Sequence, residues 1–231
     1  MFKDRAKITG KVTATVFTMD QEGLDKIQAL KKKYPDGKKD SRYGIELNEI
    51  VVKHGERKRR GHWNLKTLWS AIKTTHGQIK EIRQILAYEM VINHNIVTDQ
   101  GDAMIADLMA ETPAKTKVDN TNGYIQVGTG WTGTTPKANE TCNTGVAVEV
   151  MDATYPKLKG TFGNANDNVT QYRATFEAGE AEATDLDEAA LLNHETPASA
   201  DCLAYAELDP TTTVGASDTL QVDWEITVTG A

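Results

Sequence analysis

From residue 123 onward the chain repeats one pattern, a short apolar or alternating segment followed by a cluster of turn-forming residues. Seven such segments occur, at residues 124–127, 146–150, 157–162, 169–176, 189–194, 203–208 and 220–228. Many short strands at this spacing are typical of a β-sandwich. The last segment alternates apolar and polar residues, so we expect one buried and one solvated face. We therefore predict an antiparallel β-sandwich for the C-terminal part.

The first part of the chain predicts helices as well as strands, which makes the fold class α+β. Apolar residues at period two predict strands at residues 7–19 and 45–53, and a helix is expected from Asp20 to Lys33. Residues 65–90 carry apolar side chains every three or four positions, which predicts a long amphipathic helix. Its apolar stripe either packs on its own domain or forms a bundle between subunits.

A second, shorter helix is expected after an extended segment at residues 91–97. Thr98 and Asp99 are both good N-cap residues for it, and Asp102 would lie in its first turn. Its apolar stripe would consist of Met104, Ile105, Leu108 and Met109.

Charge divides the chain into the same two parts. Residues 1–100 contain 20 Lys and Arg against 12 Asp and Glu, a net charge of +8, whereas residues 101–231 contain 6 against 21, a net charge of −15. We therefore predict a basic N-terminal region, 1–98, and an acidic β domain, 99–231. A core shared by the two parts is the alternative. Copies packed head to tail would bring the opposite charges together.

A basic, glycine-bounded loop at residues 53–61 is the strongest local charge feature. It has three interpretations: a solvated loop, a contact with nucleic-acid phosphates, or a dock for an acidic protein surface. The acidic second part of the chain favours the protein dock, and nucleic acid is not expected as the partner. The residues that we expect to dock are Arg57, Lys58, Arg59 and Arg60, with Trp63 and Trp69 as anchors.

No arrangement of residues in the sequence predicts catalysis or a cofactor. There is no Walker loop, no dinucleotide fingerprint after Gly128 and no nucleophile elbow. The five histidines, at 54, 62, 76, 94 and 194, lack the spacing of a zinc site. We predict that the protein is not an enzyme and has no metal and no cofactor.

The acidic cluster Asp185, Asp187 and Glu188 is the remaining candidate for a calcium site. It lacks the spacing and the glycine of a known calcium loop, so we interpret the cluster as a solvated turn. Glu188 precedes an apolar run, and we expect it to pair with a backbone donor.

Cysteine content and hydropathy indicate a chain that folds inside a cell. Cys142 and Cys202 are too few for a disulfide scaffold, so we expect two reduced thiols, with a single bridge as the alternative. No apolar run approaches the ~18–20 residues of a spanning helix, and no membrane partner is expected. The first residues contain no apolar stretch, so we expect no secretory signal.

Several short motifs follow one another in an order that resembles a known set of proteins. Asn95, Val97, Thr98 and Gly101 precede a helix, and Tyr124 to Gly130 end a strand in Gly-Thr-Gly. Further motifs lie at residues 173–176, 187–193, 203–206 and 218–226. Over residues 93–229 this pattern resembles small structural proteins of tailed bacteriophage virions. Ala190 departs from the pattern, in which glycine is usual.

The resemblance implies a non-enzymatic virion component that assembles in multiple copies in the host bacterial cytoplasm. A head decoration or a neck and collar position is favoured, and a tail, baseplate or fibre-attachment position is the alternative. The implied partners are further copies and other virion proteins of the capsid, portal, neck or tail. A glycan- or receptor-binding β-sandwich module is the second hypothesis, with Trp131 as the stacking platform for a host glycan.

Overall fold

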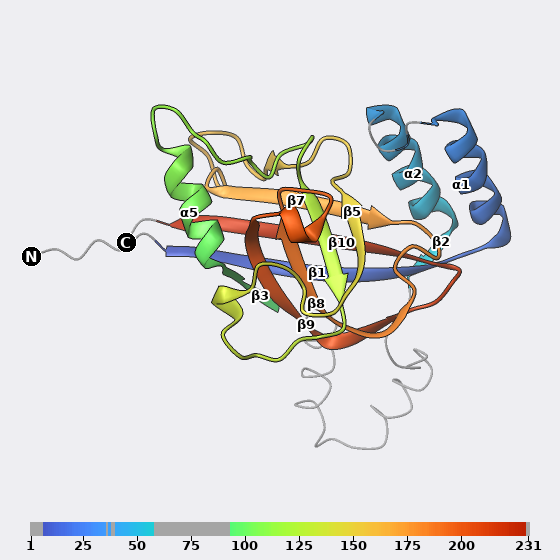
Figure 1. Cartoon of the computed structure of the whole chain (residues 1–231). Helices are drawn as coiled ribbons and strands as arrows, with labels where there is room; N and C mark the ends of the chain where they lie inside the picture. The colour runs from blue at the N-terminus through green and yellow to red at the C-terminus, as the bar shows by residue number, and fades with distance from the viewer. Residues whose placement is uncertain (1–6, 36, 38–39, 58–92, 230–231) are drawn as a thin grey trace, which may run out of the picture.

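The computed structural model describes residues 7–35, 37, 40–57 and 93–229 (Figure 1). The elements, in chain order, are β1 (Lys7–Met19), α1 (Gln21–Lys33), α2 (Ser41–His54), β2 (Gly55–Arg57), β3 (Asn93–Val97), α5 (Asp99–Leu108), β4 (Tyr124–Gly128), η2 (Pro136–Ala138), β5 (Gly145–Val150), β6 (Lys157–Leu158), β7 (Val169–Phe176), β8 (Ala183–Leu192), η3 (Pro197–Ser199), β9 (Cys202–Val214) and β10 (Asp218–Thr229). Within these residues, no helix is both long and apolar enough to cross a membrane.

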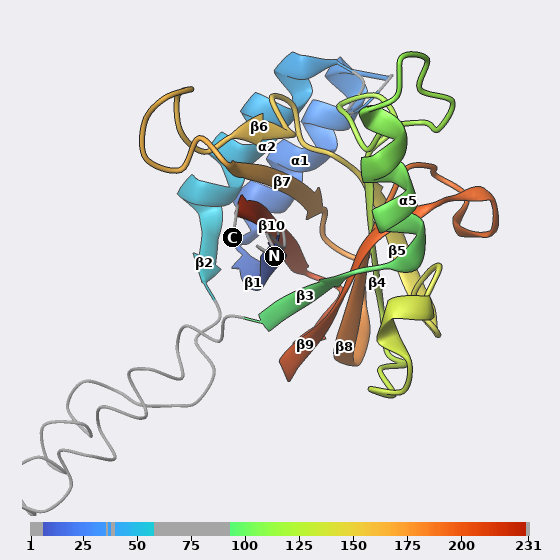
Figure 2. The same cartoon turned by 90° about the vertical axis from the view of Figure 1, so that its left-hand side faces the viewer.

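The strands of the described residues belong to one antiparallel sheet. Their order is β5-β4-β8-β9-β3-β1-β10-β7-β6, and β2 pairs with β1. The sheet curls strongly, as the end-on view in Figure 2 shows. The two ends of the sheet lie close together. Asp152, just after β5, donates its backbone N–H to Arg173 O of β7 at 2.8 Å. Thr175 of β7 donates its own N–H to the Asp152 side chain at 3.0 Å.

The predicted fold is confirmed at the level of an α+β chain with a β-rich C-terminal part. The separate sheets of a sandwich are not confirmed, because β3 and β1 connect the two halves of the sheet through backbone pairing. Asn95 pairs with Ala206 of β9 on one side and with Gly10 of β1 on the other. The halves face each other within one continuous sheet.

The main core fills the inside of the curl and draws on both predicted parts of the chain. Val12 and Val16 of β1 are buried in the same cluster as Ile125, Leu191 and Trp224. β1 pairs along its length with β10, from Lys7 opposite Thr229 to Thr18 opposite Asp218. The alternative of a shared core is therefore what the structure has, and residue 98 marks a change in composition within one sheet.

Strand β10 follows the predicted alternation. Leu220, Val222, Trp224 and Ile226 are buried, whereas Asp223 and Glu225 between them are half-buried on the other face. Trp224 has no exposed surface. Strand β7 lies where a strand was predicted, at residues 169–176, but only Lys157–Leu158 of the segment 157–162 form a strand.

Helices α1 and α2 pack together at one end of the sheet (Figure 1). Helix α1 begins where predicted, because the Asp20 side chain accepts a hydrogen bond from the Gly23 N–H at 2.7 Å. The small core of the hairpin includes Ile27, Leu30, Tyr43 and Leu47. Its contact with the sheet is both apolar and polar: Met19 of β1 belongs to this core, and Tyr43 donates its hydroxyl to the buried Glu177, which follows β7.

The strand predicted at residues 45–53 is wrong, because these residues lie in α2. Tyr43, Leu47 and Val51 are spaced by four, so they form one buried helical stripe. Ile45, which suggested a period of two, is 50% exposed. The long helix predicted at residues 65–90 lies outside the described residues.

Candidate interaction face

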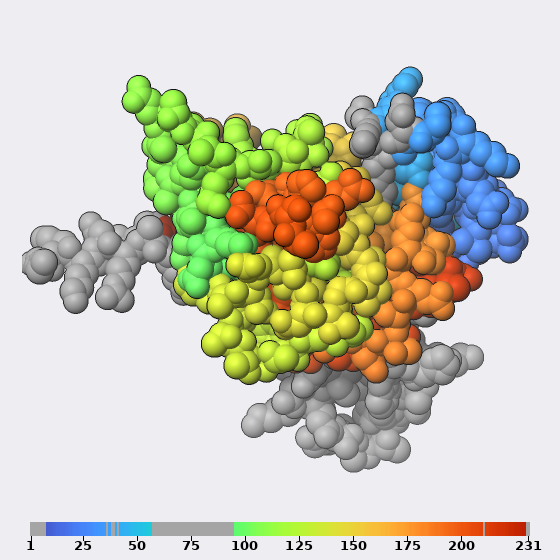
Figure 3. Space-filling view, viewed as in Figure 1, coloured from blue at the N-terminus to red at the C-terminus, as the bar shows by residue number. Residues whose placement is uncertain are grey.

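Three loops and α5 lie together on one side of the molecule, the side that faces the viewer in Figures 1 and 3. The loops comprise residues 109–123, 129–144 and 193–201, coloured green, yellow-green and orange in Figure 3. The short helix η2 of the second loop contacts α5, β3 and β9. We call α5 and these three loops the loop face.

Glu188 of β8 fixes the two ends of the loop 129–144. Its side chain is fully buried. One carboxyl oxygen accepts the N–H groups of Gly130 at 3.0 Å and Thr144 at 2.9 Å, and the other accepts that of Asn143 at 3.0 Å. The expectation that Glu188 pairs with backbone donors is therefore confirmed.

A tyrosine completes the set of donors around Glu188. The hydroxyl of Tyr205, on the neighbouring strand β9, donates to the second carboxyl oxygen. Burial and the nearby Glu188 raise the pKa of Tyr205, so its hydroxyl keeps the proton that it donates. Four donors facing two oxygens suit a carboxylate, which is an acceptor only. The arrangement holds a loop in place and leaves no oxygen of Glu188 without a donor.

Trp131 belongs to the same assembly. Its ring stacks on that of Tyr205, with ring centroids 5.0 Å apart and an interplanar angle of 25°. Its backbone N–H donates to Asp187 Oδ1 at 3.0 Å. The residue predicted to stack on a glycan is thus half-buried and packs with one face of its indole on the protein itself.

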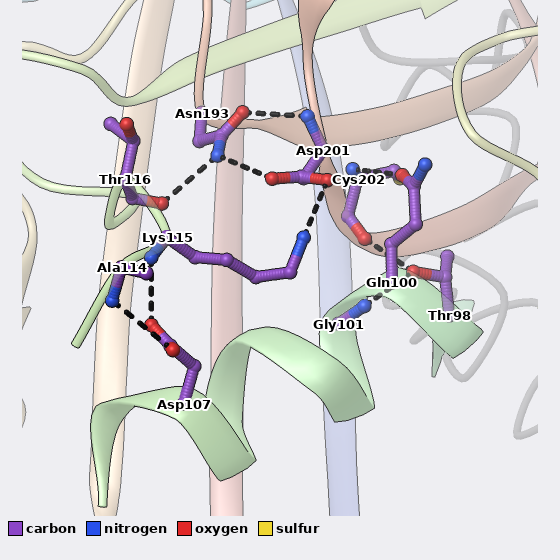
Figure 4. Close-up of polar contacts among 10 residues, drawn as sticks. All are labelled: Thr98, Gln100, Gly101, Asp107, Ala114, Lys115, Thr116, Asn193, Asp201 and Cys202. Atoms are coloured by element: carbon purple, nitrogen blue, oxygen red, sulfur yellow. Dashed lines mark hydrogen bonds and ion pairs between the residues drawn. The ribbon is translucent and has the colours of Figure 1, made fainter. Parts of the chain in front are cut away.

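A second polar network fixes the loops 109–123 and 193–201 against each other (Figure 4). Lys115 Nζ lies 3.0 Å from Asp201 Oδ1. Asn193, which is buried, donates from Nδ2 to Thr116 O at 2.9 Å and accepts the N–H of Asp201 at 2.6 Å. The turn between β8 and β9 is therefore attached to the loop that follows α5.

Asp107, in the last turn of α5, anchors the beginning of the same loop. Its two oxygens accept the N–H groups of Ala114 at 3.1 Å and Lys115 at 2.8 Å (Figure 4). The hydrogen bonds from the Lys115 and Ala114 backbones lower the pKa of Asp107. The loop is thereby folded back onto the helix that precedes it.

The start of α5 is fixed to β9. Thr98 is the N-cap, as expected: its hydroxyl oxygen accepts the Gly101 N–H at 2.9 Å, and the hydroxyl donates to Cys202 O. Gly101 lies so close to β9 that a Cβ on it would be 2.1 Å from the Leu203 carbonyl oxygen. Thr98 and Gly101 of the first motif thus hold a helix on a strand.

The loop face is acidic. Residues 99–123, 129–144 and 193–201 contain eight Asp and Glu against three Lys. Lys137 is compensated inside the face, because its Nζ contacts Asp102 and lies 3.2 Å from Asp99. Lys115 is likewise paired with Asp201. The remaining charge of the face is negative, which suits a basic partner.

The structure does not place the predicted docking residues on the loop face, because most of them are not described. Lys58, Arg59, Arg60, Trp63 and Trp69 lie outside the described residues. The backbone of Arg57 ends β2, where it pairs with Phe17 of β1. That group of six therefore stays a prediction.

The acidic cluster of β8 lies in a strand, so its interpretation as a solvated turn is wrong. Asp185 has a positive φ of 58°, and Asp187 and Glu188 bind backbone N–H groups of the loop 129–144. In the described part of the chain, no group of three or more His, Cys, Asp or Glu side chains is placed to hold a metal ion.

Cys142 and Cys202 are free, buried thiols, as expected. Burial raises the pKa of Cys202 to about 12 and that of Cys142 well above its usual range. Both therefore behave as small apolar side chains of the core beneath the loop face.

Sequence reasoning missed Tyr205, Asn143, Lys115 and Asp201. Tyr205 lies in the motif at residues 203–206, but only the register of β8 against β9 brings it to Glu188.

Comparisons with family models, curated proteins and solved structures give no match to this chain.

Proposed function

We propose that the protein is a non-enzymatic structural component of a tailed-phage virion that works by multivalent docking of protein surfaces. The observation that carries the proposal is the construction of the loop face. Buried hydrogen bonds of Glu188 and Asn193 fix its loops, so that the face has a defined shape and is acidic. The side chains of Glu188 and Asn193 are occupied by these hydrogen bonds and are not free to react. A surface whose loops are already ordered loses less conformational entropy on binding a partner.

The motifs that carry the resemblance support the same proposal. Thr98 and Gly101 hold α5 on β9, Gly130 is held by Glu188, and Asn193 joins two loops. Each of these residues shapes the scaffold that displays the loop face. Motif residues that shape the backbone, and take no part in a reaction, are what we expect of a structural protein.

Within this proposal, the facing halves of the curled sheet act as a sandwich-like scaffold. We favour a position in the head, as a decoration protein, or in the neck. The net charge of −15 over residues 101–231 and of +8 over residues 1–100 suits repeated contacts between neighbouring copies or with a shell. A tail, baseplate or fibre-attachment position is the alternative.

The test is the presence of the protein in particles. Particles produced by cells that carry the gene would be purified on a density gradient and their proteins identified and counted by mass spectrometry. We expect several copies of the intact chain per particle, resistant to washing in moderate salt. A chain that is abundant in the lysate and absent from the purified particles would contradict the proposal.

A glycan array separates this function from the module hypothesis. The virion component needs no sugar, and Trp131 already stacks on Tyr205. Specific sugar binding by the wild-type chain that is lost in Trp131→Ala would favour the module.

A further inference from the structure

The two ends of the curled sheet are strand edges, and a strand edge can accept a strand from another chain. An edge strand turns every second N–H and C=O away from its neighbour, which makes it a template for pairing. Strand β5 ends the sheet on one side, and β7, with the two-residue strand β6 beside it, ends it on the other. The groups that bind these outward N–H groups therefore decide whether the sheet can be extended.

The connection from β5 to β7 covers the outward edge of β7. Strand β6 pairs with the first half of β7. Beyond β6, Asp152 donates its N–H to Arg173 O at 2.8 Å, and its carboxylate accepts the Thr175 N–H at 3.0 Å. Just past the strand, Glu177 donates its N–H to Glu180 Oε2 at 2.7 Å. The N–H groups of Thr175 and Glu177 are thus both bound by carboxylates.

Strand β5 has the same kind of cap at its open edge. Met151, directly after the strand, donates its N–H to Gly123 O at 3.0 Å. With the register of β5 against β4, this bond means that Val148 and Val150 turn their N–H and C=O groups away from β4. The Val150 N–H donates to Glu149 Oε1 at 2.9 Å, so a carboxylate of the same strand binds it.

The composition of β5 otherwise suits strand addition. Val146 is 37% exposed, and Val148 and Val150 are half-buried, so the edge carries β-branched apolar side chains. The strand contains no lysine and no proline, which keep many natural edges unpaired. A bulge at Val146, which is skipped in the pairing with β4, shortens the regular edge. Glu149 is the side chain that protects what remains.

We infer that Glu149, Asp152 and Glu180 prevent other chains from adding strands to either end of the sheet. We call these three residues the edge carboxylates. Each accepts an N–H group that a new strand would have to bind, so strand addition must first break that hydrogen bond. The contacts are autoinhibitory, because the chain itself occupies the positions at which a second copy would pair. This role does not depend on the proposed virion function.

Hydrogen exchange of the wild-type chain tests the caps directly. Val148 and Val150 lie on the same open edge, but within the described residues only the Val150 N–H has an acceptor. We expect a protection factor at least about tenfold higher for Val150 than for Val148, together with protected amides at Thr175 and Glu177. Glu149→Ala should lower the protection of Val150 to that of Val148.

Sedimentation velocity of the full chain, in moderate salt and over a range of concentrations, measures whether an uncapped edge pairs. Glu149→Ala frees the Val150 N–H beside that of Val148, so this variant should self-associate at least about tenfold more strongly than the wild type. The associated chains should show an infrared amide I band of intermolecular β-structure. Glu149→Gln keeps a side-chain oxygen that can accept the N–H, so it should associate like the wild type.

Two further variants separate edge pairing from other causes of association. Val148→Pro, combined with Glu149→Ala, removes an N–H from the open edge without removing a hydrogen bond to β4, and should return association to the wild-type level. Proline would not rescue a chain that aggregates because it unfolds. Glu207→Ala is the matched control for the lost charge, because Glu207 is an exposed carboxylate on the inner strand β9. It should leave association unchanged.

The inference is overturned if Val148 and Val150 are equally protected in the wild type, or if Thr175 and Glu177 exchange as fast as Val148. The exchange comparison uses the wild type, so it decides the inference even where a variant does not fold. The inference is also overturned if folded Glu149→Ala associates like the wild type, if Glu149→Gln or Glu207→Ala associates as strongly as Glu149→Ala, or if proline does not reverse the association. None of these outcomes bears on the presence of the chain in phage particles, which tests the proposed function.

Discussion

Glu188 is the residue on which the shape of the loop 129–144 depends most. It is fully buried and accepts hydrogen bonds from three backbone N–H groups and one hydroxyl. Glu188→Gln replaces one oxygen by an NH2 group, which cannot accept and which faces donors. We expect the free energy of unfolding to fall by about 2–3 kcal/mol, measured by denaturant titration.

Hydrogen exchange would locate the effect of Glu188→Gln. The amides of Gly130, Asn143 and Thr144 should lose protection before the rest of the sheet. Glu207→Gln is the matched control, because Glu207 is exposed and lies directly opposite Glu188 on β9. Equal losses of stability in the two variants would show that Glu188 does not hold the loop.

Gly101 is a second residue with a measurable structural role. A Cβ at this position would meet the Leu203 carbonyl carbon at 2.9 Å as well as its oxygen at 2.1 Å, and backbone atoms cannot turn away. We expect Gly101→Ala to destabilise the protein by about 1–3 kcal/mol, even though alanine is the better helix former. Ala103→Gly, at an exposed site in the same helix, should cost no more than about 1 kcal/mol. A Gly101→Ala variant as stable as the wild type would contradict the close approach of α5 to β9.

At this scale the sequence predicts local contacts and misses distant ones. Thr98 as an N-cap and Glu188 as a partner of backbone N–H groups follow from their immediate neighbours. The donors to Glu188 come from Gly130, Asn143 and Tyr205, which only the pairing of β4, β8 and β9 brings together. Nothing in the spacing of these residues along the chain fixes that register.

At the scale of elements, α2 shows why a short apolar pattern is ambiguous. Residues 45, 47 and 51 fit a period of two, while residues 43, 47 and 51 fit a helix. The Asp40 side chain, which accepts the Arg42 N–H at 3.0 Å, starts the helix. An aspartate before an apolar run is a start signal for a helix, so Asp40 is the feature of the sequence that distinguishes α2 from a strand.

The attachment of the loop 109–123 to α5 should depend on pH. Two backbone N–H groups depress the pKa of Asp107 below its usual 3.8. The stabilisation is therefore complete above that value and is lost as the pH falls through the lower, folded-state pKa. We expect the Ala114 and Lys115 amides to be protected from exchange at about pH 5, and their protection factors to fall progressively as the pH is lowered below the usual pKa of 3.8.

Asp107→Asn should lower this protection several-fold at about pH 5, where the wild-type carboxylate is ionised, and remove its pH dependence. Asp119→Asn is the control, since Asp119 binds the amides of Thr121 and Asn122 in the same loop. It should leave the Ala114 and Lys115 amides unchanged. Protection that survives at low pH in the wild type would show that other contacts hold the loop.

At the scale of the whole molecule, most strands can be predicted but their order cannot. The segments that became β1, β7 and β10 have clear alternating or apolar patterns. Their pairing joins residues about as far apart as the chain allows, such as Thr18 and Asp218, whose side chains form a hydrogen bond at 2.8 Å. Composition suggested a boundary at residue 98, yet β3 and β1, which precede it, lie between β9 and β10, which follow it, in the sheet order.

This order makes a strong prediction for the acidic part expressed alone. A fragment of residues 99–231 lacks β1 and β3, the two strands that connect β9 to β10. The sheet would separate into β5-β4-β8-β9 and β10-β7-β6, each with a new unpaired edge, and the Val12 and Val16 contacts with the main core would be lost. We expect the fragment to show no cooperative thermal transition, a weak near-ultraviolet circular dichroism spectrum and a tendency to aggregate.

A chain of residues 7–229 is the matched control, because it keeps every described strand and should unfold cooperatively like the full chain. If the fragment 99–231 instead unfolded in a sharp transition, with a near-ultraviolet spectrum like that of the full chain, the acidic part would be an independent domain. The pairing of β1 with β10 would then be an addition to that domain. The two outcomes differ in calorimetry as well as in circular dichroism, because only a cooperatively packed core absorbs heat over a narrow temperature range.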